Sequence, residues 1–300
     1  MSQLSPHELI ISSVELNSLP EIYSQINDLI NDPYCSANDI SKIISNDPSL
    51  TMRLLKLVNS PFYGFPSQIA TVTRAIAIIG MQELRDLVLA TSVTRMFTGI
   101  PSDLVNMSQF WRQSIYCGLV ARAIAGRCTP VSSTGQAPRK HGGTRSNNKN
   151  GERLFVAGML HKIGSLVIYK KIPELSREAI SRAQFHGEVL YRAENNVIGF
   201  NHADVGGELI RQWKLPKNLE TAIEHHLFPS QSLDDSSDTA IVHLANLITT
   251  TLQSSNEEVI PPLDHKAWGN AGCAVELIGP IVDEANTQLA QTYSLVRCDH

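Results

Sequence analysis

Residues 153–164 read RLFVAGMLHKIG, a stretch in which a helical apolar pattern ends at a histidine. Phe155, Met159 and Ile163 recur every four residues, the spacing that places side chains on one face of an α-helix. The polar–apolar alternation typical of a half-buried β-strand is absent from this stretch and is sustained nowhere else in the sequence. The sequence therefore predicts an all-α fold, a bundle of many helices.

Helical patterns on both sides of this stretch have their own start signals. Ser36 to Asp39 has the arrangement of a capping box, in which side chains satisfy free amides of the first turn. Asp47-Pro48 and Asn201 to Asp204 predict two further helix starts, and Asp103 is the predicted start of a long helix that reaches about Gly126. Other helical segments are predicted near residues 18–30, 72–79, 84–97, 173–186, 188–195, 216–226, 239–252 and 271–293.

The composition of the 300 residues is that of an ordinary soluble globular protein, with 42% apolar and 18% charged residues. This length is sufficient for a substantial core in one large domain or two smaller ones. The formal net charge of −4 gives no overall attraction to phosphates, so direct nucleic-acid binding is not expected. A signal-peptide pattern and an apolar run of about 18 residues are both lacking. We therefore expect a cytoplasmic protein that does not cross a membrane.

The cysteines are five in number, scattered, and without a CxxC spacing. Neither a disulfide framework nor a zinc ribbon is expected from this pattern, and a reducing compartment is the simpler interpretation. Residues 128–152 are rich in Gly, Ser, Thr, Asn, Lys and Arg and contain hardly any apolar side chain. Such a segment buries too little surface to offset the entropy of ordering, so we predict a disordered insertion.

Four histidines in the second half of the chain are candidates for a common site: His161, His202, His225 and His226. Imidazoles that converge from separate helices are what a divalent metal site inside a bundle requires. Taken singly, each histidine is more often a polar cap or a hydrogen-bonded, half-buried side chain than a ligand. Adjacent helical residues point about 100° apart, so one of His225 and His226 is expected to face such a site.

Several segments, taken together and in order, resemble one family. They are Asp47–Leu50, Leu57–Gly64, Ala75–Gly80, Ala157–Gly164, Phe200–Gly206 and Trp213–His226. The chain resembles the HD-related output domain (HDOD) family, a degenerate branch of the HD phosphohydrolase superfamily, over roughly residues 16–226. The resemblance implies an HD-domain-like helical bundle and a role in bacterial signal transduction. We divide the chain into an N-terminal helical subdomain (1–110), a degenerate HD-like subdomain containing the insertion (111–252) and a C-terminal helical extension (253–300).

Catalytic HD enzymes hold divalent metals with histidines and aspartates, and the resemblance implies that this chain has lost part of that set. The early-helix histidine falls at Gln113, the His-Asp pair reads His161-Lys162, and the late aspartate falls at Asn246. An ammonium reverses the attraction that a carboxylate gives a cation, roughly 4 kcal/mol per unit-charge pair at about 4 Å and an effective dielectric of about 20. Gln113 and Asn246 can offer only neutral oxygens, so hydrolysis by the usual HD mechanism should fail.

The remaining histidines keep other chemistries open, although no cofactor is expected. Three imidazoles suffice for one zinc-type ion, so a single divalent metal held by His161, His202 and one of His225 and His226 is an alternative. Lys162 with the nearby histidines could instead bind a phosphorylated, nucleotide-type ligand without cleaving it.

The turn Asn59-Ser60, followed by Tyr63-Gly64, also belongs to the resemblance. Asn and Ser beside proline end helices by bonding local backbone groups, which favours a structural corner. The alternative is a surface through which the domain contacts a partner.

We therefore expect no catalytic residue and a non-enzymatic regulatory output module, which acts through a signalling protein partner or a small ligand. The alternative is a residual metal-dependent phosphohydrolase acting on nucleotides or cyclic dinucleotides.

Overall fold

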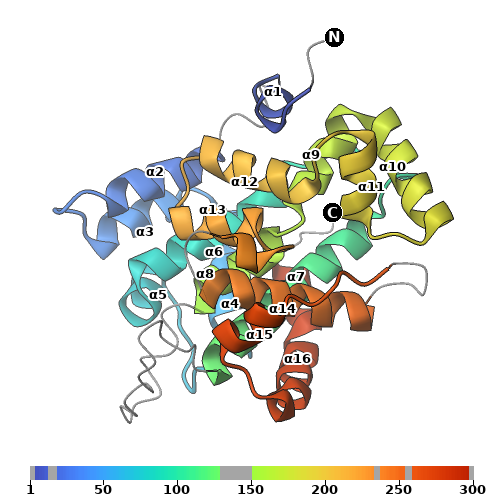
Figure 1. Ribbon diagram of the computed structural model, residues 1–300. Helices are drawn as coiled ribbons and strands as arrows, with labels where there is room; N and C mark the ends of the chain where they lie inside the picture. The colour runs from blue at the N-terminus through green and yellow to red at the C-terminus, as the bar shows by residue number, and fades with distance from the viewer. Residues whose placement is uncertain (1–3, 13–18, 129–150, 233–236, 254–258, 297–300) are drawn as a thin grey trace.

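A computed structural model describes residues 4–12, 19–128, 151–232, 237–253 and 259–296 of the chain. Every regular element in these ranges is a helix, which confirms the predicted all-α fold (Figure 1). In chain order the elements are α1 (Pro6–Ile11), α2 (Glu21–Ile30), α3 (Ala37–Ser45), α4 (Pro48–Val58), α5 (Val72–Ile79), α6 (Met81–Val93), α7 (Met107–Arg127), α8 (Gly151–Leu160), α9 (Ile163–Lys171), α10 (Pro173–His186), α11 (Leu190–Val197), α12 (His202–Gln212), α13 (Lys217–Glu224), η3 (Pro229–Gln231), α14 (Ser237–Gln253), α15 (His265–Ala271), η4 (Val275–Leu277) and α16 (Ile278–Val296).

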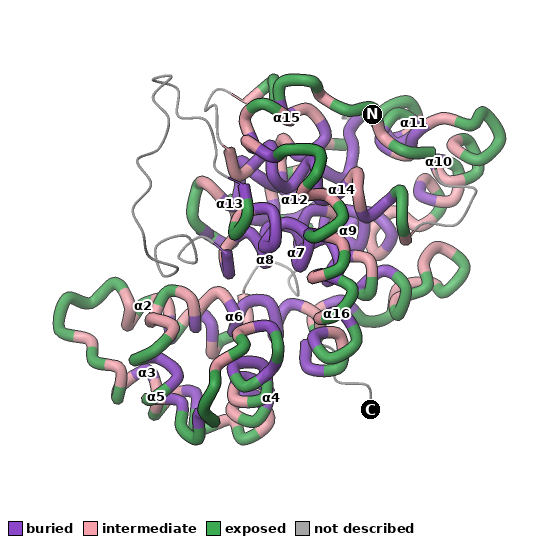
Figure 2. The backbone as a smooth tube through the Cα atoms, turned by 90° about the horizontal axis from the view of Figure 1, so that it is seen from below, coloured by how far each residue is buried: buried purple, intermediate pink, exposed green. Residues whose placement is uncertain are grey.

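The helices form two groups, which Figure 2 shows one above the other. The lower group contains α2 to α6, and the upper group contains α8, α9 and α12 to α15 around α7. Helix α8 packs on α6 as well as on α7, and α16 packs on both α7 and α4. These contacts join the two groups around one main hydrophobic core. The proposed three-part division of the chain remains a prediction.

The helix starts agree with the sequence where the signal is local. Ser36 forms the predicted capping box, Asn201 caps the predicted start of α12, and the Asp47 side chain accepts the Leu50 amide at the start of α4. The predicted start of the long helix at Asp103 was wrong. Helix α7 begins at Met107 instead, after an Asn106 cap. Ser18, the first residue of the predicted helical segment near residues 18–30, lies outside the described residues.

Asp103 has a different role from the predicted cap. Its carboxylate accepts a hydrogen bond of 2.7 Å from the Arg177 guanidinium of α10, so a contact distant in sequence occupies the group. The side chain that caps α7 is that of Asn106, whose oxygen accepts the Gln109 amide at 3.1 Å. The error arose because the sequence contains two acceptable caps within four residues and does not show which one has another partner.

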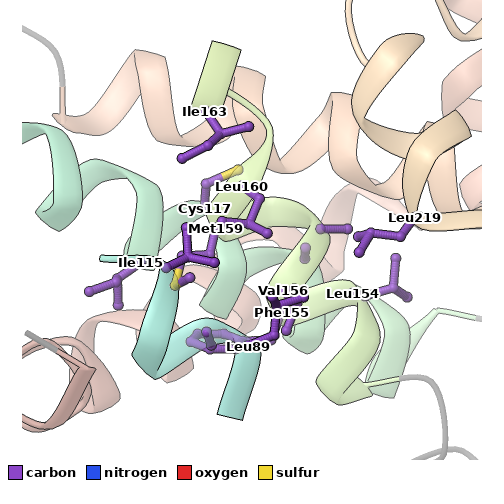
Figure 3. Packing of buried hydrophobic residues seen from close by; sticks show 14 of the residues in the cluster. Leu89, Ile115, Cys117, Leu154, Phe155, Val156, Met159, Leu160, Ile163 and Leu219 are labelled. Carbon is purple, nitrogen blue, oxygen red and sulfur yellow. The ribbon is translucent and has the colours of Figure 1, made fainter. Parts of the chain in front are cut away.

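Helices α7 and α8 cross at two glycines, Gly118 and Gly158. A Cβ on Gly158 would lie 2.8 Å from both the Cys117 carbonyl oxygen and the Gly118 Cα, so the backbones touch. Figure 3 shows Cys117 beside Met159 and Leu160 at this crossing. The close approach seats the end of α8, and with it His161, deep inside the bundle.

A second close approach positions His202. Helices α9 and α12 cross at Gly164 and Gly206, where a Cβ on Gly164 would collide with the backbone of His202 and of Gly206. Gly164 therefore sets the distance between the start of α9 and the start of α12. The two crossings bring the residues after α8 and at the start of α12 towards the same region.

The ends of the predicted disordered insertion belong to the core, which corrects its boundaries. Cys128 caps the end of α7 and Gly151 and Glu152 begin α8, and all three are buried. The remainder of the predicted insertion, residues 129–150, lies outside the described residues. Cys128 also forms a disulfide with Cys273, so the expectation that the cysteines are unpaired was wrong for these two. The pair is separated by 145 positions, and no local spacing rule could have found it.

None of the helices in the described ranges is both long enough and apolar enough to cross a membrane.

Candidate functional site

Three of the four predicted histidines converge. His161 follows α8, His202 begins α12 and His226 follows α13, and their side chains are buried, with exposed fractions of 2%, 4% and 0%. The His161 and His226 ring centroids lie 5.1 Å apart, and those of His202 and His226 lie 5.7 Å apart. His226 is thus the member of the adjacent pair that joins the cluster, whereas His225 caps the end of α13 and is half-buried.

Each of the three imidazoles is oriented through its Nδ1 atom. For His161 and His226, Nδ1 lies 2.6 Å and 2.7 Å from the backbone carbonyl oxygen three residues earlier. For His202, Nδ1 lies 2.6 Å from Oε2 of Glu194. Carbonyl oxygens and carboxylates accept hydrogen bonds, so Nδ1 carries the proton and donates it in each case. In the neutral ring the remaining Nε2 atom is then an acceptor.

Asn246 of α14 occupies the Nε2 atom of His161. Its terminal amide lies 3.0 Å from that nitrogen, and it also contacts the Thr250 hydroxyl at 3.3 Å. One polar atom of the amide is left without a partner in the described residues. The Nε2 atoms of His202 and His226 likewise have no described hydrogen-bond partner. The cluster therefore has one engaged acceptor and two unengaged ones.

The imidazoles of His161 and His226 are held neutral. Burial, followed by the nearby Lys162 charge, lowers the pKa of His161 from 6.5 to about 3. Burial also lowers the pKa of His226 well below its ordinary value, with the other two histidines acting in the same direction. Desolvation disfavours a charged ring in such a site. Both rings are therefore uncharged at neutral pH.

The residues predicted to replace the HD ligands lie close to His161. Gln113, His161, Lys162 and Asn246 line one small internal cavity of about 10 Å³. The Gln113 amide donates to the Gln253 carbonyl oxygen at 3.1 Å, which ties it to the end of α14. Four of the seven predicted pocket residues thus line one cavity.

The donor set does not fit the divalent metal of an HD enzyme. In the part of the chain that the structure describes, no group of three His, Cys, Asp or Glu side chains is arranged to hold a metal ion. Asn246 engages the Nε2 atom of His161, and the Glu194 carboxylate is turned towards Nδ1 of His202. Lys162 adds positive charge beside the cluster. A hard cation would need carboxylate oxygens that this site does not offer.

Two residues that support the cluster were missed from the sequence. Glu194 is 2% exposed and accepts both the backbone amide and the Nδ1 proton of His202. His243 of α14 donates through Nδ1 to the His226 carbonyl oxygen at 2.7 Å, and its Nε2 accepts the Asp264 amide at 3.0 Å. Both roles depend on contacts between separate helices or across a turn, and no motif spacing indicates them.

The side chains of Asn59 and Ser60 hold this turn through hydrogen bonds to nearby backbone groups. The Asn59 amide donates to the carbonyl oxygens of Leu55 and Ile69, and its oxygen accepts the Ile69 amide at 2.7 Å. The Ser60 hydroxyl donates to a carbonyl oxygen of α4 and Gly64 has a φ of 61°. The geometry supports the structural corner, and contact with a partner remains a prediction.

The aromatic residues after this turn connect the two groups of helices. The Phe62 ring packs edge-on against Phe155 of α8, with 5.1 Å between centroids, and is stacked by the Arg122 guanidinium of α7 at 3.8 Å. Arg122 also pairs with the buried Glu152 at 3.9 Å. The neighbouring Tyr63 is half-buried and stacks on Phe65.

A larger cavity of about 310 Å³ adjoins the histidine cluster. It lies among α7, α9, α10, α11, α12 and α14, and Gln113, Lys162, His202 and Asn246 contribute to its wall. Four of the predicted pocket residues are therefore shared with a cavity large enough for a small ligand.

Comparison with known proteins identifies the family of the chain. A model of the HDOD domain matches residues 16–229. The fold is similar to an HDOD domain protein of unknown function from Geobacter sulfurreducens, with a TM-score of 0.70, 21% identity, and coverage of 97% of this chain and 95% of that one. A candidate phosphohydrolase from Shewanella amazonensis gives a TM-score of 0.69 at 22% identity, over 96% of both chains. A candidate signal transduction protein from Marinobacter aquaeolei gives 0.67 at 18% identity, over 93% of this chain and 58% of that one.

Among curated proteins, an uncharacterized protein from Treponema pallidum is 24% identical over 219 residues. These residues are 72% of this chain and 38% of that protein, so this chain corresponds to a minor part of that relative's length.

Proposed function

Because the chain belongs to the HDOD domain family, we propose that it is a non-enzymatic regulatory module, which transmits a signal by binding a protein or a small ligand. The observation that carries this proposal is the hydrogen bond between Asn246 and Nε2 of His161. That nitrogen is the atom that a metal would need, and here it is engaged by a neutral amide. The name of the Marinobacter aquaeolei neighbour, a candidate signal transduction protein, is in line with this role.

The charge of the site supports the same proposal. Lys162 stands where the resemblance places a metal-binding aspartate, and its charge disfavours protonation of both His161 and His226. A divalent cation at the cluster would meet the same repulsion at twice the charge. Without a bound ion, no group of the described cluster lowers the pKa of an attacking water towards neutrality.

A phosphohydrolase screen tests the proposal. Purified full chain is incubated with Mn²⁺, Mg²⁺, Zn²⁺ or Ni²⁺ and a panel of phosphomonoesters, nucleotides and cyclic dinucleotides, with phosphate release and nucleotide products measured. We expect no turnover above that of the His161→Ala variant. Turnover that chelation abolishes and that His161→Ala lacks would contradict the proposal.

The second candidate function is a residual metal-dependent phosphohydrolase acting on nucleotides or cyclic dinucleotides. One observation favours it: the Nε2 atoms of His202 and His226 are buried acceptors without a described partner, and Nδ1 of each ring donates to a fixed oxygen. Metal-ligating histidines usually have this arrangement. The same screen distinguishes the two candidates, because this one requires chelator-sensitive turnover that depends on both residues.

A further inference from the structure

The cavity of about 310 Å³ beside the histidine cluster has an unusual polar wall. Three residues on it have a buried polar atom without a hydrogen-bond partner in the described chain: Nε2 of His202, the hydroxyl of Tyr191 and one amide atom of Asn246. Their exposed fractions are 4%, 4% and 1%. Buried polar atoms are satisfied in the great majority of cases, so three unsatisfied ones around one cavity indicate groups that a ligand would complete.

A cationic side chain, that of Lys162, stands at this wall. Lys162 lines the same cavity; burial and then its charge lower the pKa of His161, and its charge opposes the burial that raises the pKa of Cys117. The acidic residue on the wall is Glu188, whose carboxylate is bonded to the Arg182 guanidinium at 2.8 Å. The polar wall thus combines two donors to an anionic head group, the Lys162 ammonium and the Tyr191 hydroxyl, with Nε2 of His202, an acceptor that a proton of the same head group can satisfy.

The rest of the cavity is apolar. Its lining includes Leu104, Phe110, Ile180, Val189, Leu190 and Leu227, which come from α7, α10, α11 and the segments beside them. An apolar lining with a few convergent polar groups is typical of small-molecule sites. Burial against such side chains stabilises a ligand body that is itself apolar, and it penalises a hydroxyl-rich sugar.

We propose that this cavity binds a small organic anion, with a hydrogen phosphate or similar proton-bearing acidic head group that accepts from Lys162 and Tyr191 and donates to Nε2 of His202, and with an apolar body against the aliphatic wall. This inference rests on the proposed function and names the ligand class through which the module would be regulated. The cavity volume is at the lower end of the roughly 300–1,000 Å³ of ligand sites. A cyclic dinucleotide, with two bases, two sugars and two phosphates, is too large and too polar for it.

Isothermal titration calorimetry with the full chain tests the head group. The anionic probes are phenylacetate, phenyl phosphate, octanoate and indole-3-acetate. Phenylacetate and indole-3-acetate are each compared with the corresponding neutral amide. Adenosine monophosphate and cyclic diguanylate are included as nucleotides. We expect at least one anion to bind at least about tenfold more tightly than its neutral counterpart, because a charge-assisted contact is lost in the amide. Phenyl phosphate should bind more tightly than phenylacetate, because an ionised carboxylate has no proton to donate to Nε2 of His202.

Matched variants test the wall. Tyr191→Phe removes a hydroxyl that has no described partner, so the unfolding midpoint should stay the same or rise, while anion affinity falls about five- to tenfold. Tyr116→Phe is the control, because the Tyr116 hydroxyl is also buried and unsatisfied but that residue is absent from the cavity wall. Lys162→Gln should lower anion affinity at least about tenfold and leave amide binding unchanged. Lys42→Gln, at a lysine side chain that is 78% exposed, is its control.

The outcomes separate this inference from the function on which it rests. Equal binding of anions and neutral amides, stronger binding of a nucleotide than of every simple anion, or equal losses in Tyr191→Phe and Tyr116→Phe would each overturn the ligand assignment. Absence of binding by every probe would also overturn it, while a negative phosphohydrolase screen would leave the non-enzymatic function standing. Chelator-sensitive turnover would refute the function itself.

Discussion

Replacing Glu152 by leucine should destabilise the protein by about 3–5 kcal/mol, because the Arg122 charge is then buried without its counter-ion. The two side chains are 2% and 9% exposed, and Nη2 of Arg122 lies 3.9 Å from Oε1 of Glu152. At that distance and an effective dielectric of about 20, their attraction is about 4 kcal/mol. Burial nevertheless raises the pKa of Glu152 against the opposing effect of Arg122. Desolvation therefore outweighs the attraction, and the pair should be replaceable as a unit.

A double-mutant cycle measures both parts of this argument. Urea denaturation at pH 7.5 is followed for Glu152→Leu, Arg122→Met and the double variant. Each single variant should lose about 3–5 kcal/mol, and the double variant should recover to within about 2 kcal/mol of the wild type. The remaining loss includes the Arg122 stacking on Phe62. Additive losses in the double variant would refute the coupling.

The control is an ion pair with a shorter distance and greater exposure. Arg177 lies 2.7 Å from Asp103, but the two side chains are 38% and 57% exposed. Arg177→Met should therefore cost less than about 1 kcal/mol. A loss as large as that of Arg122→Met would show that distance, and not burial, determines the effect.

Three further predictions concern the site and its supports. The pKa of His161 is lowered to about 3 by burial, so the unfolded chain binds more protons below pH 6.5 and stability is lost as the pH falls from there. The unfolding midpoint of His161→Gln should fall less between pH 6.5 and 5 than that of the wild type, and equal slopes would contradict the assignment. Gly158→Ala should cost about 1–3 kcal/mol in urea because the added Cβ meets the α7 backbone, while Gly126→Ala on exposed α7 surface, with open space around it, should stabilise by up to about 1 kcal/mol. Similar effects of the two changes would argue against the close crossing. Asn59→Ala should lower stability by about 2–3 kcal/mol, since its amide makes three hydrogen bonds to the backbones of Leu55 and Ile69, and a loss under about 0.5 kcal/mol in thermal denaturation would show that the turn is held by other contacts.

Local signals in the sequence were sufficient for the fold class and for several helix starts. The capping boxes at Ser36 and Asn201 each involve residues three positions apart, so the sequence contains all the information that the geometry uses. Asp103 shows where local signals are insufficient. Its carboxylate is suited to capping α7, but the contact with Arg177 is 74 positions away and cannot be inferred from the neighbouring residues.

The candidate site was predictable in part from residue types and in part from the family resemblance. The histidines of the second half of the chain indicated His161, His202 and one of the two adjacent histidines. The resemblance added Gln113, Lys162 and Asn246, and the structure places these residues close to the histidines. Helical geometry alone then gave the expectation that one member of the adjacent pair would be excluded.

The supporting contacts of the site could not be predicted. Glu194 reaches His202 across the turn before α12, and the Cys128–Cys273 disulfide joins residues at the ends of different helices. Such contacts depend on how separate helices cross, here fixed in part by Gly164 and Gly206. A single sequence contains no spacing rule for them.

The metal content of the purified full chain tests the loss of the HD metal site most directly. After purification without chelator and equilibration with Zn²⁺, Mn²⁺ or Ni²⁺, the protein is freed of unbound ion and metal is measured by inductively coupled plasma mass spectrometry. Asn246 at Nε2 of His161 and the charge of Lys162 predict well under one metal ion per chain, and the same low value in the His202→Ala variant. One tightly held ion per chain in the wild type that is lost in His202→Ala would contradict the account.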